Sequence, residues 1–255
     1  MKPDYSKFSR EDTAKMEEIT GVPAKAMLVQ SGLLPTPPKD ALVLDSACGG
    51  GVVTTVLFNV IGKTSDVRVV CGDLEEYMVT SAAERIKANG WNAEATVVDA
   101  QAVPFPDSHF THNLMNFGMQ VIPDNALVVK ESFRVLQPGG KLGLTIWTEP
   151  GWLQSLVAGV PGFTVPPLLT SGPMASKESI TNLLTVAGFA QIDVQPLTFE
   201  HTDAISRYLG YMKEVFTQLR VGETAERYEA YMRERYGNGD FTLTWKALVV
   251  TAEKP

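Results

Sequence analysis

The chain has few of the residues that build disulfide frameworks or metal centres. Its 255 residues include two cysteines and three histidines, so we expect neither a disulfide-stabilised fold nor a metal site. No apolar run reaches the roughly 20 residues that span a bilayer, and the polar start has no signal-peptide core. We therefore expect a cytoplasmic protein without a membrane span. The formal charge of −7 disfavours nucleic acid as a partner, because phosphate binding needs clustered Lys and Arg.

A glycine-rich turn directly after an apolar segment is the most informative feature that the chain does contain. Residues 43–51 read Val-Leu-Asp-Ser-Ala-Cys-Gly-Gly-Gly, and a second apolar run, 52–60, follows them. This order predicts a buried strand, a tight turn and a helix whose N-terminus suits a carboxylate or phosphate. Asp73 ends the next apolar run, at about the position of a carboxylate that binds ribose hydroxyls. The two features together predict a site for a nucleotide-like ligand.

Strand-like and helix-like segments alternate from residue 41 to residue 147. The helical patterns end at glycine, and Asp124 is placed to cap one of them. Alternation of this kind predicts an α/β fold, with a mostly parallel sheet covered by helices on both faces. The predicted strands are 41–45, 67–73, 95–99, 110–116 and 141–147.

The remaining segments flank this core, and we expect the whole chain, 1–255, to form a single domain. Two short helices are predicted before the first strand, and residues 1–38 are expected to act as a helical lid over the core, 39–147. The substrate side is expected in 148–255. The segments predicted there are a loop insertion (148–175), a helix capped by Ser176, strands 192–199 and 241–251, and one amphipathic helix between those strands.

Four short motifs follow one another in the core, at 43–51, 71–74, 97–107 and 133–142. In this order they resemble the class I S-adenosylmethionine-dependent methyltransferases, and in particular the small-molecule group that includes the ubiquinone and menaquinone biosynthesis methyltransferases. The resemblance covers residues 40–147 well and 176–255 in pattern only. It implies a Rossmann-like, seven-stranded sheet whose last strand is antiparallel. It also implies S-adenosyl-L-methionine as cofactor and S-adenosyl-L-homocysteine as product.

The resemblance implies that Asp73 holds both ribose hydroxyls and that Asp99 and Ala100 meet the adenine. Asp45 can hold the ammonium group of the cofactor, although a strand-ending Asp also commonly caps the following helix. Ala47 stands where the family usually has glycine, and its methyl is tolerated if the backbone keeps a negative φ. The expected cofactor-binding residues are Asp45, Ala47, Gly49, Gly51, Asp73, Leu74, Asp99, Ala100 and Asn116.

The catalytic group is expected among the three histidines, because imidazole titrates near neutral pH. His201 follows the sixth strand on the substrate side and is the candidate general base. His112 is interpreted as a packed core residue and His109 as a solvated one. The side chains expected to line the substrate site are Phe117, Gln120, Trp147, Trp152 and Tyr208, although packing alone would also explain the two tryptophans and the helix face of Tyr208.

The function expected from these features is O- or N-methylation of a small, aromatic or polycyclic metabolite. One alternative keeps the fold and uses the bound sulfonium only as a fixed charge, in a cyclase or isomerase. A second alternative is a non-catalytic partner subunit. A nicotinamide oxidoreductase is disfavoured, because the turn lacks the Gly-x-Gly-x-x-Gly pattern.

Overall fold

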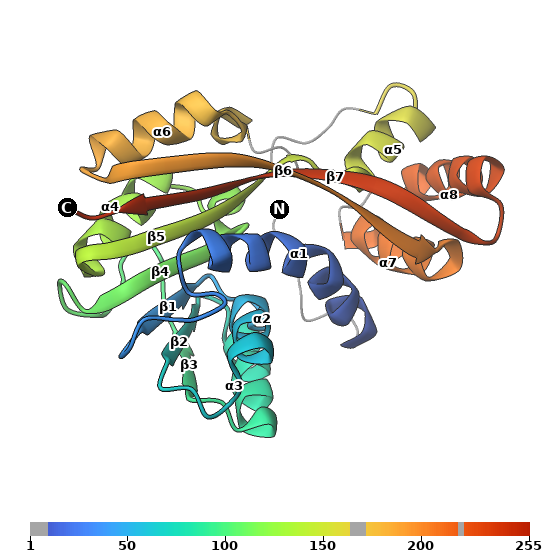
Figure 1. Cartoon of the computed structure of the whole chain (residues 1–255). Coiled ribbons are helices and arrows are strands. Elements are labelled where there is room, and N and C mark those ends of the chain that lie inside the picture. Colours follow the sequence, from blue (N-terminus) through green and yellow to red (C-terminus); the bar gives the residue numbers. More distant parts are fainter. Residues whose placement is uncertain (1–9, 164–171, 219–221) are drawn as a thin grey trace.

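The structure, a computed structural model, describes residues 10–163, 172–218 and 222–255 (Figure 1). Its centre is a seven-stranded sheet with the order β3-β2-β1-β4-β5-β7-β6. The strands β1 to β5 run parallel to one another, and β7 is antiparallel to both β5 and β6. The predicted fold is therefore confirmed. The strands are β1 (Leu42–Ser46), β2 (Arg68–Asp73), β3 (Ala93–Val97), β4 (Phe110–Asn116), β5 (Leu136–Glu149), β6 (Ala190–Ala204) and β7 (Asp240–Glu253).

Helices cover both faces of this sheet, and each face has its own hydrophobic core. On one face lie α1 (Arg10–Gln30), α2 (Val52–Ile61) and α3 (Glu76–Asn89); on the other lie α4 (Asn125–Val135) and α6 (Lys177–Val186). Two predicted caps are confirmed. The side chain of Asp124 accepts hydrogen bonds from the first turn of α4, and that of Ser176 accepts one from the first turn of α6.

The two predicted N-terminal helices form a single helix, α1, which continues through Pro23; Ser9, the expected first cap, lies outside the described residues. Packing explains the continuity, because Ala24, Met27 and Leu28 are fully buried against α2 and the sheet. This burial outweighs the hydrogen bond that a proline removes from a helix interior. The C-terminal half of α1 is therefore part of the core, and the lid role expected for residues 1–38 stays a prediction.

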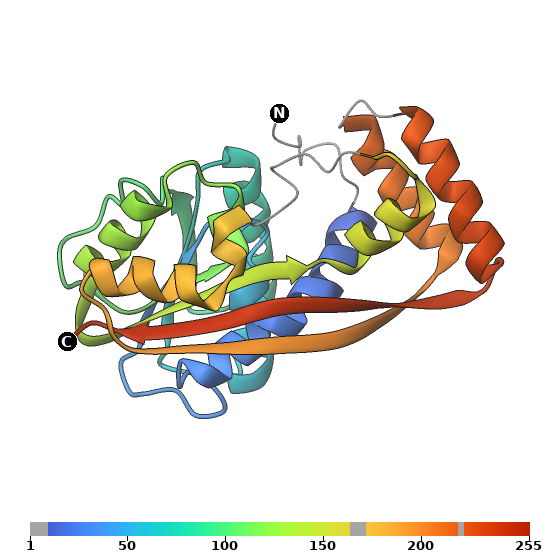
Figure 2. The ribbon, with the colours of Figure 1, turned by 90° about the horizontal axis from the view of Figure 1, so that it is seen from above.

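The last two strands continue beyond the sheet as a long two-stranded ribbon, visible in orange and red in Figure 2. Three helices gather on this extension around a third hydrophobic cluster: α5 (Gly151–Gly159), α7 (Ile205–Gln218) and α8 (Gly222–Tyr236). The prediction of a loop over 148–175 is wrong at two places, because α5 and a 3₁₀ turn, Gly172–Ala175, form there. Residues 164–171 of the predicted loop lie outside the described part. The single helix predicted between the strands is two.

Candidate active site

The turn after β1, residues 47–51, is called the glycine turn below, and two hydrogen bonds hold it to β2. The N–H of Cys48 donates to the carbonyl of Gly72 at 3.0 Å, and the N–H of Gly49 donates to Asp73 Oδ2 at 2.8 Å. Gly49 has a φ of 53°, which glycine adopts without steric cost. A Cβ at Gly49 would meet no atom within 4 Å, so the backbone there has room for a ligand.

Asp73 is the last residue of β2, and Asp99 follows the carboxyl end of the neighbouring strand β3. Asp73 Oδ1 accepts a hydrogen bond from the N–H of Glu75 at 3.0 Å, and Asp99 Oδ1 accepts one from the N–H of Gln101 at 2.8 Å. A carboxylate has about four acceptor positions, so Asp73 keeps capacity for two hydroxyls beyond the bonds it makes here. The other two residues predicted at this edge are Leu74, which is exposed, and Ala100, which is buried.

Asp45 lies at the end of β1 and is completely buried. Its Oδ2 accepts hydrogen bonds from the N–H and the hydroxyl of Thr54, at 3.2 and 2.7 Å, so the carboxylate caps α2 as the alternative interpretation expected. Burial raises the pKa of Asp45 to about 7, and the hydrogen bonds from Thr54 oppose the shift. Within the described part of the chain, the buried Oδ1 has no hydrogen-bond partner. Asp45 therefore has one carboxylate oxygen in structural use and one left for a cation or water.

Ala47 does not keep the negative φ that its methyl group would favour. Its φ is 50°, in the left-handed region, and its Cβ packs close to Gly118. The geometry of the turn requires this conformation whatever residue occupies the position, which explains why glycine is usual there. The chain thus carries a local strain of about 1–2 kcal/mol at its glycine turn.

Asn116 and Phe117 end β4 beside the glycine turn. Asn116 Oδ1 accepts a hydrogen bond from the hydroxyl of Thr145 at 2.6 Å, and its Nδ2 donates to the carbonyl of Thr20 at 3.3 Å. Phe117 has a φ of 62° and stacks on Trp147, with ring centroids 3.9 Å apart. These contacts join the end of β4 to β5 and to α1.

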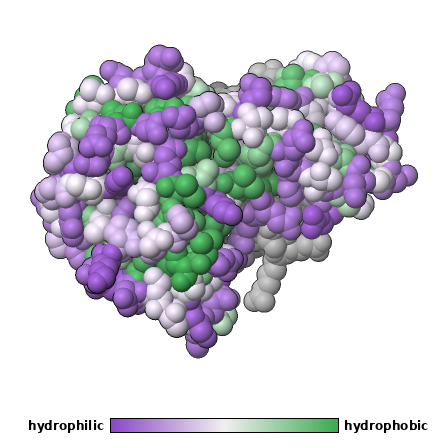
Figure 3. Space-filling view, in the orientation of Figure 1, coloured by the Kyte–Doolittle hydropathy of each residue, from purple (hydrophilic) through white to green (hydrophobic). Residues whose placement is uncertain are grey.

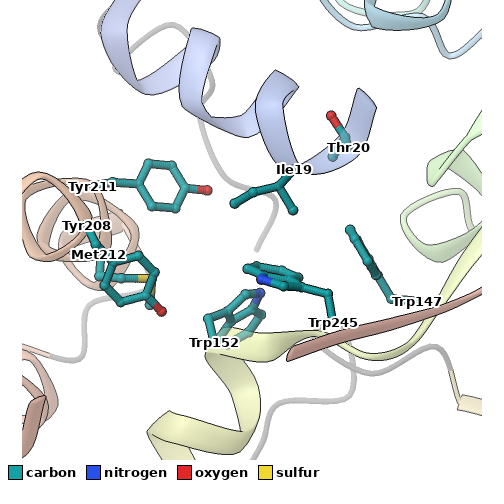
Figure 4. Close-up of a pocket in the computed structure, with 8 residues that line it drawn as sticks. All are labelled: Ile19, Thr20, Trp147, Trp152, Tyr208, Tyr211, Met212 and Trp245. Carbon is teal, nitrogen blue, oxygen red and sulfur yellow. The ribbon is translucent and has the colours of Figure 1, made fainter. Parts of the chain in front are cut away.

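An enclosed pocket with mostly aromatic walls, called the aromatic pocket below, lies where α1, α5, α7 and the strands β5 and β7 meet (Figure 4). It encloses about 50 Å³, enough for a few water molecules, so a ring-sized ligand requires its side chains to move apart. Three of the predicted substrate-lining residues, Trp147, Trp152 and Tyr208, line it. Phe117 and Gln120 instead contact Trp147 from outside. The full lining is Ile19, Thr20, Trp147, Trp152, Tyr208, Tyr211, Met212 and Trp245.

His201, the predicted general base, does not line the aromatic pocket. Its Nε2 lies 3.8 Å from Glu18 Oε2, so it faces α1 from the strand extension. His112 is a core residue as predicted: it is 5% exposed, and burial lowers its pKa to about 4. The prediction of a solvated His109 is wrong, because its ring is half-buried and stacks on Phe105 with centroids 5.6 Å apart.

Several residues at the two sites were not predicted from the sequence. Glu17, Ile19 and Thr20 belong to the N-terminal helix, and nothing in the local pattern shows which elements that helix crosses. Tyr211 and Met212 could have been predicted as lining residues from the sequence, because they share a helix with Tyr208. Trp245 alternates with other apolar residues along β7, a pattern that indicates burial but not a pocket.

A second hollow is an open apolar groove along α1 and α2. Figure 3 shows hydrophobic surface over these helices near the centre of the view, and the groove is lined by Val22, Val29, Val56 and Leu197 among others. None of the cofactor residues named above lines this groove, and no contact among the described residues assigns it a ligand.

Similarity to known proteins agrees with this geometry. A family described as "Methyltransferase domain" matches residues 43–140. Methyltransferase tpcH of Aspergillus fumigatus is 27% identical, over 95% of this chain and 94% of its own length. Acetylaranotin bis-thiomethyltransferase of Aspergillus terreus is also 27% identical, over 94% and 92%. The crystal structure of a proposed methyltransferase from Bacillus halodurans superposes with a TM-score of 0.62 at 20% identity, over 91% of this chain and 98% of that one.

Residues 43–140 therefore form a methyltransferase domain of the class I S-adenosylmethionine-dependent type, and the relatives that match nearly the whole chain are methyltransferases, so the protein is an enzyme. The residues present fit the cofactor, because the backbone at Gly49 is open and the buried Oδ1 of Asp45 has no partner among the described residues. The described residues include no cluster of His, Cys, Asp or Glu suited to a metal ion. None of the helices in the described segments combines the length and apolarity that crossing a membrane requires.

Proposed function

We propose that the enzyme methylates an oxygen or nitrogen atom of a small aromatic metabolite held in the aromatic pocket. The observation that carries the proposal is the position of Trp147. This residue lines the pocket on one side and stacks on Phe117, at the carboxyl end of β4, on the other. Ligands of open α/β sheets bind beyond the carboxyl ends of the strands, so the pocket adjoins the place where the cofactor's methyl group would lie.

The cofactor-binding roles follow from the same edge of the sheet. Asp73 would accept hydrogen bonds from the ribose hydroxyls. The glycine turn would bind the carboxylate of the methionine part of the cofactor, and Asp45 would bind the ammonium group of the same part. Asp99 and Ala100 would flank the adenine. When bound, S-adenosyl-L-methionine supplies a methyl group together with its own leaving group. The chain then has to orient the acceptor, align it with the methyl group and exclude water.

A walled aromatic pocket serves these tasks. Flat ring systems stack favourably on tryptophan and tyrosine, and each such contact contributes about 0.5–1.5 kcal/mol beyond burial. Since the pocket is closed in this structure, the acceptor and its walls would exclude bulk water together. Positioning of this kind accelerates transfer without a charged catalytic side chain. His201 is not assigned as the base, because it faces Glu18 instead of the pocket.

A sulfur acceptor is a second candidate, favoured by the similarity to a protein named as a bis-thiomethyltransferase. Incubation of the enzyme with S-adenosyl-L-methionine and a panel of phenols, aromatic amines and aromatic thiols tests both candidates. Mass spectrometry should detect S-adenosyl-L-homocysteine and a product heavier by one methylene group. Trp152→Ala should reduce turnover, whereas Trp91→Phe, in a residue that stacks on Phe58 instead, should not. A product of the folded enzyme that has the same mass as the substrate would favour the cyclase or isomerase alternative.

A further inference from the structure

We infer that Glu17 and Arg85 form a positioning pair that couples the cofactor site to the aromatic pocket through one turn of α1, residues 17–20. The inference rests on the proposed function, because it concerns the two sites defined there. A single helical turn touches both sites, and its side chains point to different elements.

The first contact of this turn is with the glycine turn. Glu17 Oε1 lies 2.6 Å from Arg85 Nη1, and a Cβ built at Gly50 would lie 3.5 Å from the same carboxylate oxygen. Arg85, on α3, also donates to the hydroxyl of Thr55 on α2 at 3.2 Å. Both charged side chains are about three-quarters buried, at 22% and 23% exposure. An ion pair shielded in this way is screened by solvent less than a surface pair, so it can fix α1 against the cofactor-binding turn.

The second contact is with the aromatic pocket. Ile19 is 4% exposed and belongs to the aromatic cluster, and Thr20 lines the pocket beside it. Figure 4 shows both residues on α1, on the side of the pocket opposite Trp152. The carbonyl of Thr20 accepts the hydrogen bond from Asn116 at the end of β4. Because residues 17 and 20 are separated by one helical turn, a shift at one is transmitted to the other.

The third contact anchors the same turn to the strand extension. Glu18 Oε2 lies 3.4 Å from Arg207 Nη2 and 3.8 Å from His201 Nε2, and Arg207 also binds Asp203 at 2.6 Å. This polar cluster connects α1 to α7, the helix that carries Tyr208. His201 thus has a structural place in the coupling even though it does not line the pocket.

Two sites built on one rigid element should bind their ligands cooperatively. A ligand that orders the turn at the cofactor site lowers the free energy needed to order the pocket wall, and the coupling is reciprocal. Cofactor binding should therefore tighten the aromatic pocket before any acceptor is present. Glu17 is the residue through which this effect passes.

Tryptophan fluorescence provides the test, because three of the four tryptophans line the pocket. Trp91→Phe removes the fourth, and acrylamide quenching then reports access to Trp147, Trp152 and Trp245 alone. S-adenosyl-L-homocysteine is the probe, and calorimetry measures its binding. Glu17→Gln is compared in this background with Glu229→Gln, which alters an exposed ion pair with Arg233 on α8. Arg85→Gln tests the same pair from α3 if Glu17→Gln is poorly folded.

Saturating S-adenosyl-L-homocysteine should lower the quenching constant of the background protein and of Glu229→Gln, and leave that of Glu17→Gln unchanged. Loss of the coupling should also weaken binding of the probe to Glu17→Gln about fivefold or more, the low end of typical coupling. The inference would be overturned if S-adenosyl-L-homocysteine lowered the quenching constant of Glu17→Gln as much as that of the Trp91→Phe background. It would also be overturned if the probe bound the background protein without lowering its quenching constant. Either result would leave the proposed function intact. Failure of the folded wild type to bind the probe would overturn both.

Discussion

Phe117 lies face to face with Trp147, with ring centroids 3.9 Å apart and planes inclined by 6°. Phe117 directly follows β4, and its φ of 62° turns the chain into the 3₁₀ turn Gly118–Gln120. Trp147 belongs to β5 and lines the aromatic pocket. The stacked pair therefore lies between the cofactor edge of the sheet and the proposed acceptor site.

Phe117→Ala should raise the KM of an acceptor found in the mass-spectrometric screen. Loss of an aromatic stack costs about 0.5–1.5 kcal/mol, which corresponds to roughly a two- to tenfold effect. Steady-state kinetics measure the change, and Phe117→Tyr, which keeps the stacked ring, is the control. Affinity for S-adenosyl-L-homocysteine should stay within about twofold, because the pair orients the acceptor side. A loss confined to cofactor affinity would contradict this position for the pair.

Ala47→Gly should stabilise the protein. The left-handed conformation costs an L-residue about 1–2 kcal/mol, and glycine gives back roughly 0.5–1 kcal/mol of that gain as entropy of the unfolded chain. A net gain of up to about 1.5 kcal/mol should appear in urea unfolding. Ala83→Gly, on the exposed side of α3, is the control and should lose about 1 kcal/mol. Destabilisation by Ala47→Gly would show that the methyl's packing outweighs the strain.

His112 should make the fold less stable in mild acid. Burial lowers its pKa from 6.5 to about 4, so between these values the unfolded chain binds a proton that the folded chain excludes. The contribution of His112 is thus present above pH 6.5 and is lost as the pH falls towards 4, to a total of about 3 kcal/mol. Urea unfolding of His112→Gln at a series of pH values should show a shallower decline than the wild type. Identical slopes would mean that His112 is already charged in the fold.

Asp45 should make cofactor binding depend on pH near neutrality, because its raised pKa is about 7. Its pKa is raised by burial from 3.8 to about 7, so its contribution to stability is present below 3.8 and is lost as the pH rises through 7. The ammonium group of a bound cofactor favours the ionised carboxylate, so affinity for S-adenosyl-L-methionine and for S-adenosyl-L-homocysteine, which both carry this group, should rise as the pH increases from about 6 to about 8. Calorimetry with either ligand over this pH range measures the effect. Asp45→Asn should remove the pH dependence, and its persistence there would exclude Asp45 as the source.

Local pattern was sufficient to predict the core of this fold. The glycine turn, Asp73 and the helix caps at Asp124 and Ser176 could be predicted because they depend on residues that are close in sequence, whereas Asp99 was named only from the resemblance. The antiparallel direction of the last strand came from the resemblance, and the order of the strands in the sheet was not predicted, because periodicity does not reveal which strands are neighbours.

The parts that were missed depend on long-range contacts. Glu17 reaches the glycine turn only because α1 crosses the sheet, and the continuity of α1 through Pro23 depends on tertiary burial of Met27 and Leu28. His201 was predicted on the substrate side, but the strand extension directs it towards Glu18. Such placements are decided by where whole elements pack, which no local spacing encodes.

The most direct test of the account is calorimetric titration of S-adenosyl-L-homocysteine into the wild type, Asp73→Asn and the exposed-site control Asp240→Asn. The account predicts binding by the wild type and by Asp240→Asn. Asp73→Asn should bind about ten- to a hundredfold more weakly, because hydrogen bonds to a charged acceptor contribute about 1.5–3 kcal/mol. Equal affinity of all three proteins, or no binding by the folded wild type, would contradict the assignment of the cofactor site.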